Sequence, residues 1–346
     1  SVAFMIQVLQ AATEQTWAKP QSIASKHFRR VLVEDSSQYK IKASNSDDFP
    51  GHGNGKYTTA GCKVDLTFDL LTGIPVHQVL ERATFQDKEL GKELIDMVRP
   101  LDLILRDMGY FSIAEFIRVE QRRAFWLSRL PLNVGVMTES GESLEKTLRK
   151  HRGQNMDIDV LLGNEALHPV RLVAIRADKI VAQERRRKRR QKARREGKQA
   201  NAKALLLDGW HVMVTNISRN KMEVSELAEL YSVRWQVEIT FRAWKQAGQL
   251  EKVLNRRSNP LHLITMIYAS ILWLVLNMKT AAVIQGNLLG TKIRLSIEKL
   301  IDDMSDYLMI LTDIRKMFDY APYLPHITME SRTRQPLINT CISCLS

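Results

Sequence analysis

The order of strand and helix patterns between Arg30 and Leu130 constrains the fold more than any other feature. Three strand-like stretches come first, VLVEDSSQYKI, CKVDLTFDL and IPVHQVLE, separated by turns. A helical pattern over residues 86–98 follows, then the short apolar strand DLILRD, the helix SIAEFIRVEQRR with Ser112 as its N-cap, and the strand RAFWLSRL. Period-2 and period-3.6 hydrophobic patterns distinguish the two kinds of element. Successive strands followed by alternating helices and strands predict an α/β fold.

The region after this core changes in character. Short strands, DIDVLLG, HPVRLVAIR and GWHVMVTNI, are separated by Gly, Pro and a basic run, which predicts a β-rich insertion; a long helix begins near residue 223. The whole order is that of a ribonuclease H-like core interrupted by an insertion, with flanking helices. The first residue is Ser, so the N-terminal segment is possibly truncated, and the irregular tail is expected to be loosely held. The predicted divisions are 1–30 (N-terminal helical segment), 31–130 (first part of the core), 131–222 (insertion), 223–285 (second part of the core) and 286–346 (C-terminal helical region and tail).

Charge is the compositional feature that bears on function. The 346 residues are 45% hydrophobic and 26% charged, values typical of a folded soluble chain, but the formal net charge is +13. The sequence pI is about 9.7. Such an excess favours a polyanionic partner, with nucleic acid preferred over a membrane surface. No phosphate-binding loop of the G-x-x-x-x-G-K-[ST] type occurs, so nucleotide hydrolysis is not indicated.

Most of the excess charge is local. Residues 179–203 contain twelve Lys or Arg and two Glu, a net charge of +10. This segment has few apolar residues to bury, which predicts a mobile loop or a solvated helix. We expect contacts with phosphate backbones that carry no sequence information, the alternative being a solubilising loop. The expected contact residues are Arg185, Arg186, Arg187, Lys188, Arg189 and Arg190.

Cysteine content and hydropathy indicate the compartment. The three cysteines, Cys62, Cys341 and Cys344, make no disulfide framework, and the single CISC lacks the second ligand pair of a structural zinc site. Reduced thiols predict a cytoplasmic protein. The most apolar stretch, from Leu263 to Leu276, is expected to be a buried helix too short to span a bilayer, so no membrane partner is predicted.

The segment YSVRWQVEITFRAWK contains Tyr231, Arg234, Glu238 and Lys245 at intervals of three, four and seven residues. On a helix these intervals return to nearly the same face, so one stripe presents an acid between two bases. The alternative is a solvated salt-bridge ladder with little energetic effect. Large apolar neighbours favour a partly buried stripe, where a charge needs a partner or a metal ion.

Two upstream acids complete a possible metal site. Asp107 ends the strand DLILRD before a Gly-containing turn and a helix, which is where α/β folds place ligands, although a capping Asp is the alternative. Asp35 lies on the apolar first strand, and its neighbour Glu34 is the obvious rival. Asp65 and Asp69 share one face of the next strand and are explained as its polar, solvated face. Carboxylates from distant positions can together hold magnesium beside a phosphodiester.

The Y-x-x-R-x-x-x-E-x-x-x-x-x-x-K spacing, together with DMGYFS and DLLTGIP, resembles the insertion-sequence-four family of bacterial DDE transposases over about residues 30–284. The family has Gly-Thr after its first Asp, whereas Ser36 and Ser37 follow Asp35 here. The resemblance implies an acidic triad of Asp35, Asp107 and Glu238 that binds Mg²⁺, with Mn²⁺ as a substitute. It implies contacts of Tyr231, Arg234 and Lys245 with terminal phosphates. Trp210 would stack on a flipped base, or is simply a core aromatic of the insertion.

The resemblance also implies the function. It predicts metal-dependent cleavage and strand transfer at the ends of an insertion sequence, acting on double-stranded DNA with terminal inverted repeats and on target DNA. A homodimer in the DNA complex and association with the nucleoid are expected. Two alternatives stay open at this point: a catalytically inactive DNA-binding remnant, and a ribonuclease H-like nuclease.

Overall fold

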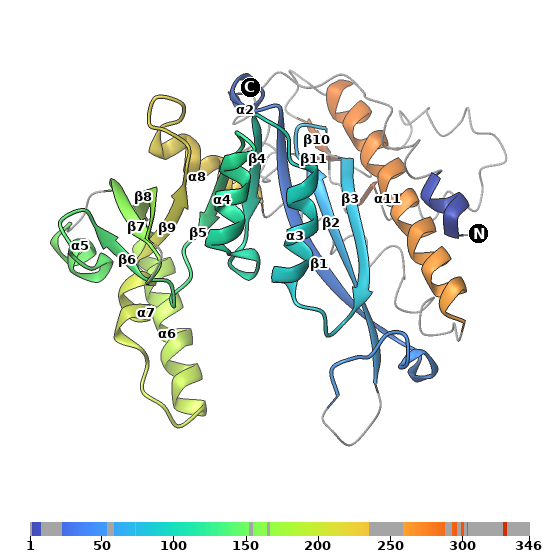
Figure 1. The fold of residues 1–346 in the computed structure, drawn as a ribbon, viewed down its shortest axis with the longest axis horizontal. Helices are drawn as coiled ribbons and strands as arrows, with labels where there is room; N and C mark the ends of the chain where they lie inside the picture. Colours follow the sequence, from blue (N-terminus) through green and yellow to red (C-terminus); the bar gives the residue numbers. More distant parts are fainter. Residues whose placement is uncertain are drawn as a thin grey trace. The chain divides into compact units, whose positions relative to one another are not determined.

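The computed structural model confirms the α/β class and divides the chain into two compact units (Figure 1). The first unit comprises residues 1–94 and 232–346, and the second comprises residues 95–231. The structure describes residues 2–7, 23–53, 59–72, 74–151, 155–164, 167–234, 259–287, 293–295, 299–300, 303 and 328–330.

The first unit contains the three successive strands that the sequence predicts. They are β1 (Arg30–Ile41), β2 (Ala60–Asp69) and β3 (Ile74–Arg82), and β2 pairs antiparallel with both of the others. Because directly opposed residues share a face of a sheet, the register Asp35↔Leu66 places the Asp35 side chain on the apolar face. The register Glu34↔Thr67 places Glu34 on the opposite, polar face.

The helix α3 (Asp87–Met97) crosses this polar face, as Figure 1 shows. Asp87 at its start forms an ion pair with Lys63 at 2.8 Å and accepts a hydrogen bond from the Ser36 hydroxyl at 2.9 Å. Farther along the helix, Glu93 lies 4.0 Å from His77 of β3. Every residue of β2 is therefore buried, and the expectation that Asp65 and Asp69 lie on a solvated face is wrong.

The described strands of the second unit lie in the spatial order β4-β5-β9-β8-β7-β6. Strands β4 and β5 pair in parallel, and α4 (Ile113–Gln121) makes the crossover that parallel strands require. Ser112 occupies the predicted N-cap position of α4 but makes no capping side-chain hydrogen bond. The strands are β4 (Asp102–Arg106), β5 (Phe125–Arg129), β6 (Val136–Thr138), β7 (Met156–Leu162), β8 (His168–Arg176) and β9 (Trp210–Thr215).

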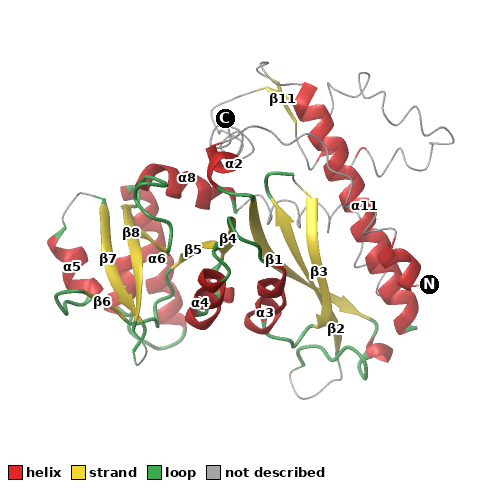
Figure 2. Cartoon of the chain, turned by 45° about the horizontal axis from the view of Figure 1, so that its top comes forward, coloured by secondary structure: helices red, strands yellow, loops and turns green. Residues whose placement is uncertain are grey.

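The helices of the second unit include one that the hydrophobic pattern could not distinguish from a loop. The basic run forms α6 (Lys179–Arg195), whose start is capped by the Asp178 side chain on two backbone N–H groups. It is followed by α7 (Ala202–Leu207), and Figure 2 shows α6 behind β7 and β8. Strand β6 and the helix α5 (Leu144–Lys150) were not predicted. Helix α8 (Val224–Val233) begins the predicted long helix.

The remaining elements correct two expectations. Helix α11 (Pro260–Asn287) has 28 residues and contacts β3, with Leu263, Ile267 and Ile271 buried on one side. Its stretch Pro260–Ala281 is long and apolar enough to cross a membrane, so the shorter predicted length was wrong, although core helices of soluble proteins have the same properties. Strand β11 (Thr328–Glu330), where the tail begins, pairs with β10 (Ile293–Leu295) in a two-stranded sheet. Strand β10 lies in the C-terminal region that was predicted to be helical.

Candidate active site

Asp107 follows β4 directly and precedes a short 3₁₀ turn, η2 (Met108–Tyr110). Its backbone is extended, with φ −81° and ψ 168°, and its side chain makes no capping hydrogen bond to that turn. The capping role that competed with a metal-binding role is therefore absent. The carboxylate is half-buried at the carboxyl end of a strand, a position where α/β sheets bind ligands.

Arg106, the residue before Asp107, is a buried cation that the sequence analysis missed. Its side chain is 1% exposed, donates to the carbonyl of Tyr110 at 3.1 Å, and lies 3.7 Å from a carboxylate oxygen of Glu115, which is also buried. A buried guanidinium requires such partners, because an unpaired charge in the interior is costly. The signal in the sequence was a single Arg at the end of the apolar stretch DLIL.

Tyr231 connects α8 to this strand. Its hydroxyl donates a hydrogen bond to the carbonyl oxygen of Arg106 at 3.2 Å, across 125 positions of sequence. The tyrosine of the Y-x-x-R spacing therefore lies beside the backbone that carries Asp107. Its ring is half-buried.

Asp35 and Glu34 differ in their environments on β1. Glu34 is fully buried on the face that α3 covers. Asp35 is half-buried, and one of its carboxylate oxygens accepts a hydrogen bond from the Ser36 N–H at 3.0 Å. A carboxylate that binds a metal ion and a DNA phosphate must be reachable from solvent, which favours Asp35 over Glu34.

Asp69, the other rival, is used by the turn after β2. One of its oxygens accepts from the backbone N–H groups of Val31 and Leu71, at 3.2 and 3.1 Å, and the other accepts from the Thr72 hydroxyl at 3.2 Å. A carboxylate with three such donors and 3% exposure stabilises the turn. This structural role removes the reason to consider it as the first acid.

The other predicted residues of the stripe are only partly described. Glu238 and Lys245 lie outside the described residues, and Arg234, which is described, is 8% exposed. Within the described part of the chain, no three His, Cys, Asp or Glu residues are grouped closely enough to hold a metal ion. Asp35 lies in the first unit and Asp107 in the second, and their convergence with Glu238 stays a prediction.

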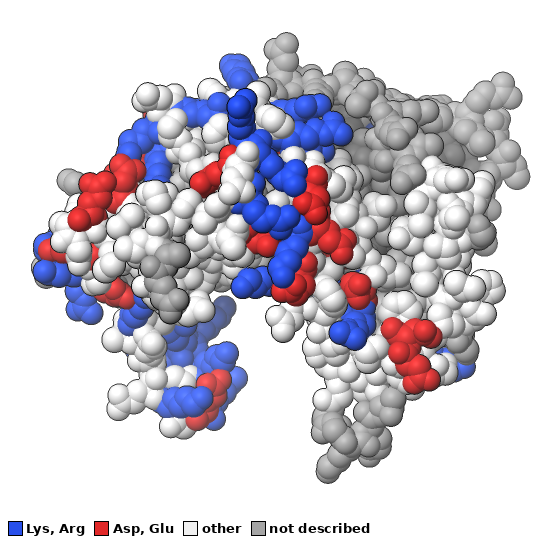
Figure 3. Space-filling model, in the orientation of Figure 1, with Lys and Arg blue, Asp and Glu red and all other residues white. Residues whose placement is uncertain are grey.

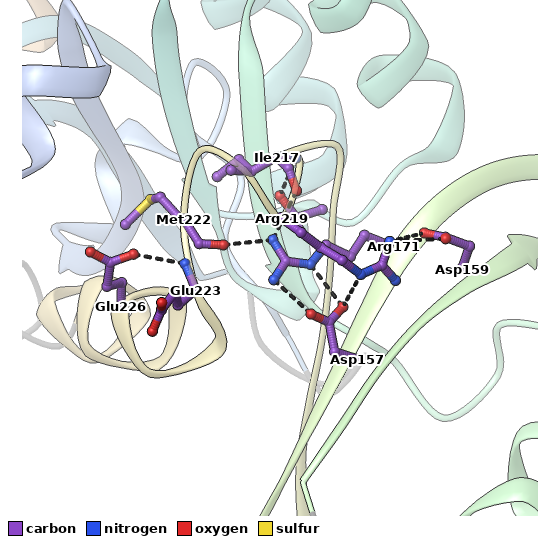
Figure 4. A network of polar contacts seen from close by, with 9 residues as sticks. Asp157, Asp159, Arg171, Ile217, Arg219, Met222, Glu223 and Glu226 are labelled. Carbon is purple, nitrogen blue, oxygen red and sulfur yellow. Dashed lines mark hydrogen bonds and ion pairs between the residues drawn. The ribbon is translucent and has the colours of Figure 1, made fainter.

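The start of α8 is fixed by a polar network that the sequence analysis also missed (Figure 4). Arg171 of β8 is 5% exposed, and its guanidinium donates to the carbonyls of Ile217 and Met222 at 3.1 and 2.9 Å. The same group makes a bidentate pair with Asp157 of β7, at 2.9 Å for both bonds. Arg219 approaches Asp157 from the more exposed side at 3.1 Å. The insertion strands thus anchor the loop that leads into the helix of Tyr231.

The six predicted phosphate contacts on α6 are not equivalent. Arg189 makes a bidentate pair with the buried Asp208, both bonds being 2.8 Å, and Arg186 donates to the carbonyl of Leu205 at 3.0 Å. With Ala182, these two residues form the inward face of the helix. Through Arg186 and Arg189 this face contacts α7 and the turn before β9. Figure 3 shows Lys and Arg side chains gathered over α6 at the lower left.

The outward face of α6 is exposed. Arg187 and Lys188 form ion pairs there with Glu184, at 2.8 and 3.6 Å. Arg190, the residue after the inward Arg189, is also exposed. The sixth residue, Arg185, is half-buried beside β9. The exposed positions can reach a DNA backbone without breaking a contact to another element of the fold, because the pairs of Arg187 and Lys188 lie within α6 itself.

Trp210 opens β9 as predicted but is 2% exposed. The guanidinium of Arg176 lies over its ring, 4.1 Å from the centroid, in a cation–π contact. One ring face is therefore occupied by a side chain of the insertion itself. Stacking on a flipped base stays a prediction, and it requires Arg176 to move.

Comparison with known proteins identifies related sequences. A family model described as "Transposase DDE domain" matches residues 26–274. The transposase for insertion sequence element IS231F of Bacillus thuringiensis subsp. israelensis is 29% identical over 268 residues, 72% of this chain and 56% of that protein. The transposase for IS1151 of Clostridium perfringens is 25% identical over 247 residues, 66% of this chain and 52% of that protein. The chain spans little more than half the length of these curated relatives.

Comparison with solved structures finds the piggyBac transposase synaptic complex with hairpin DNA. The match covers 86% of this chain and 57% of the piggyBac chain, with a TM-score of 0.41 and 12% sequence identity.

Proposed function

This chain belongs to the transposase DDE domain family, and we propose that it cuts and joins DNA at the ends of an insertion sequence. The observation that carries the proposal is the position of Asp107, a half-buried carboxylate that follows a parallel strand and makes no capping bond to the next turn. The carbonyl of the preceding residue, Arg106, accepts a hydrogen bond from Tyr231 on the helix of the Y-x-x-R spacing. The same arrangement is what a metal-dependent phosphoryl transferase needs from its second acid.

For the fold, we propose a ribonuclease H-like core made from residues 31–130 and 223–285, interrupted by the insertion at residues 131–222. This interpretation is supported by the antiparallel pairs β1–β2 and β2–β3, which are followed by the parallel pair β4–β5 joined by α4. The antiparallel strands β6 to β9 support a β-rich insertion that also contains α6 and α7.

For the metal ion, the donor set fits magnesium. Asp35, Asp107 and Glu238 would supply carboxylate oxygens, the hard ligands that Mg²⁺ prefers, with Mn²⁺ as a substitute. Asp35 and Asp107 both have a half-buried side chain, so each is reachable. When bound, the ion offsets the negative charge that builds up on the attacked phosphate.

The proposed reaction is a hydrolysis followed by a transesterification, without a covalent protein intermediate. Water attacks a phosphodiester at the element's end, forming a new P–O bond and releasing a 3′ hydroxyl. That hydroxyl then attacks a second phosphodiester, in the opposite strand or in target DNA, and displaces another 3′ oxygen. Tyr231 holds the strand of Asp107 in place, and Arg234 and Lys245 are proposed to contact the terminal phosphates.

The proposed partners follow from the same chemistry. Double-stranded DNA with terminal inverted repeats is the substrate, and two copies of the chain would bring two ends together. Exposed residues of α6 contribute phosphate contacts that are independent of sequence. A cytoplasmic location at the nucleoid is proposed with this substrate.

The test uses linear duplex DNA carrying the terminal repeats that flank the gene, with and without Mg²⁺. We expect strand cleavage by the wild type and none by Glu238→Gln, because Gln keeps the shape but lacks the charge that holds a divalent ion. Duplex affinity should be the same for both proteins. Comparable nicking by the Gln variant in Mg²⁺ contradicts the proposed role of Glu238.

A further inference from the structure

Three basic side chains from separate segments of the second unit meet on one face of its sheet. Arg129, the last residue of β5, is directly opposite Met213 of β9, and the backbone N–H of Leu130 bonds to the carbonyl of Val212. Residues two apart on a strand share a face, so His211 lies on the Arg129 face and diagonally across from it.

Helix α6 brings the third side chain. A guanidinium nitrogen of Arg185 lies 3.5 Å from Nε2 of His211. Because a guanidinium can only donate, Nε2 accepts, and the imidazole is neutral in this arrangement. All three side chains are half-buried, so the cluster can be reached from solvent. Arg186 and Arg189, on the inward face of α6, fix the helix that presents Arg185.

The positive charge of this cluster is not balanced locally. Burial lowers the pKa of Arg185, and the nearby Arg129 lowers it further. Burial likewise lowers the pKa of His211, with Arg185 and Arg129 as additional causes. Asp208 is the acid that acts on Arg185, but both of its oxygens accept hydrogen bonds from Arg189. In the ranges that the structure describes, no carboxylate forms an ion pair with any of the three.

We propose that Arg129, Arg185 and His211 form a binding site for one backbone phosphodiester of DNA. This inference rests on the proposed function, and it adds Arg129 and His211 to the residues that meet the nucleic acid. An anion offsets the repulsion between the two guanidinium groups and accepts charge-assisted hydrogen bonds from both. It also accepts from His211 once the imidazole is protonated and no longer receives the Arg185 bond.

The site couples binding to a proton. In the free protein the pKa of His211 lies below its usual value of 6.5, and a neighbouring phosphodiester raises it. Between the two values, binding takes up a proton, so the affinity for DNA rises as the pH falls from the pKa of the bound state to that of the free protein. Above both values the imidazole is neutral in either state, and this dependence ends.

The test follows the eight histidines of the protein by NMR after ¹³C labelling of the imidazole carbons, with His211→Gln identifying the His211 signal. A 20-base-pair duplex should raise the pKa of His211. In binding titrations, Arg129→Gln should lower the salt dependence by about 0.9 in log affinity per log salt. His211→Gln should remove the rise in affinity at low pH. Arg219→Gln, whose guanidinium is neutralised by Asp157 and Asp159, is the matched control.

The outcomes separate this inference from the proposed function. An unmoved His211 pKa in a protein that binds the duplex overturns the site and leaves the transposase proposal intact. A shift with inorganic phosphate but none with the duplex overturns the assignment to DNA. Magnesium-dependent cleavage of the duplex by the wild type tests the proposed function separately. A wild type that neither binds nor cleaves the duplex defeats both proposals.

Discussion

The hydroxyl of Tyr231 donates to the carbonyl of Arg106, one residue before Asp107, at 3.2 Å. This bond joins the helix of the Y-x-x-R spacing to the strand that presents the second acid. It explains why a tyrosine, with an apolar ring and a polar tip, suits that position. A role in holding the Asp107 strand is separate from any contact with a phosphate.

Tyr231→Phe tests that role. The variant keeps the ring and loses one hydrogen bond, which is worth about 0.5–1.5 kcal/mol net. We expect the cleavage rate at saturating DNA to fall by about tenfold, equivalent to about 1.4 kcal/mol, with an unchanged affinity for the duplex. Tyr268→Phe, on α11, is the matched control. A lower affinity for the duplex with a normal rate at saturating DNA would show a phosphate contact instead.

Arg171→Met tests the anchor of α8. The substitution leaves the carbonyls of Ile217 and Met222 without their donor and Asp157 without its bidentate partner. We expect the free energy of unfolding to fall by about 2–4 kcal/mol, since removal of one partner from a buried pair is costly. The value is read from urea denaturation.

Arg219→Met provides the control for that measurement. Its side chain is 44% exposed and also contacts Asp157, so its loss should cost below about 1 kcal/mol. Equal effects of the two substitutions would contradict the account of Arg171 as the buried anchor.

The two faces of α6 predict different phenotypes. Replacing Arg187, Lys188, Arg190 and Arg194 with Gln should flatten the dependence of log affinity on log salt by roughly 3–4 units, at about 0.9 per lost phosphate contact. Sequence discrimination should change little. Stability should also change little, because these side chains are exposed.

Arg189→Gln, one residue from Arg190, should lower the stability of the protein and leave the salt dependence of DNA binding unchanged. The substitution breaks the pair with Asp208, which is 6% exposed. Unchanged salt dependence in the fourfold variant would end the DNA-contact interpretation of the outward face.

The strand and helix order was predictable because the alternation in CKVDLTFD and the apolar run in DLILR are local signals. Burial of the polar face of β2 was not, because it depends on α3, whose Asp87 approaches Lys63 and Ser36 only in the folded protein. The apolar part of α11 was judged too short because only Leu263 to Leu276 was counted, a stretch that contains Thr265 and Ser270. The Thr265 hydroxyl bonds to the carbonyl of Leu261, four residues earlier, so this polar residue does not interrupt the helix.

The position of a candidate residue in the fold was predictable where the residue carries its own signal. Asp107 has such a signal, as the last residue of an apolar strand before a Gly turn. Arg171 has none, since a lone Arg in HPVRLVAIR gives no indication of its three partners on β7 and the loop before α8. The division of α6 into inward and outward faces likewise required α7 and Asp208, which composition does not reveal.

A change of ligand chemistry at Asp107 tests whether this carboxylate binds the divalent ion that drives strand cleavage. Asp107→Cys replaces a hard oxygen with a softer sulfur, which magnesium binds poorly and manganese binds better. With terminal-repeat duplex as substrate, we expect no cleavage by this variant in Mg²⁺ and recovered cleavage in Mn²⁺. Asp96→Asn, at a carboxylate with 67% exposure, should cleave normally in both ions. Cleavage by Asp107→Cys in Mg²⁺ at the wild-type rate would contradict the account.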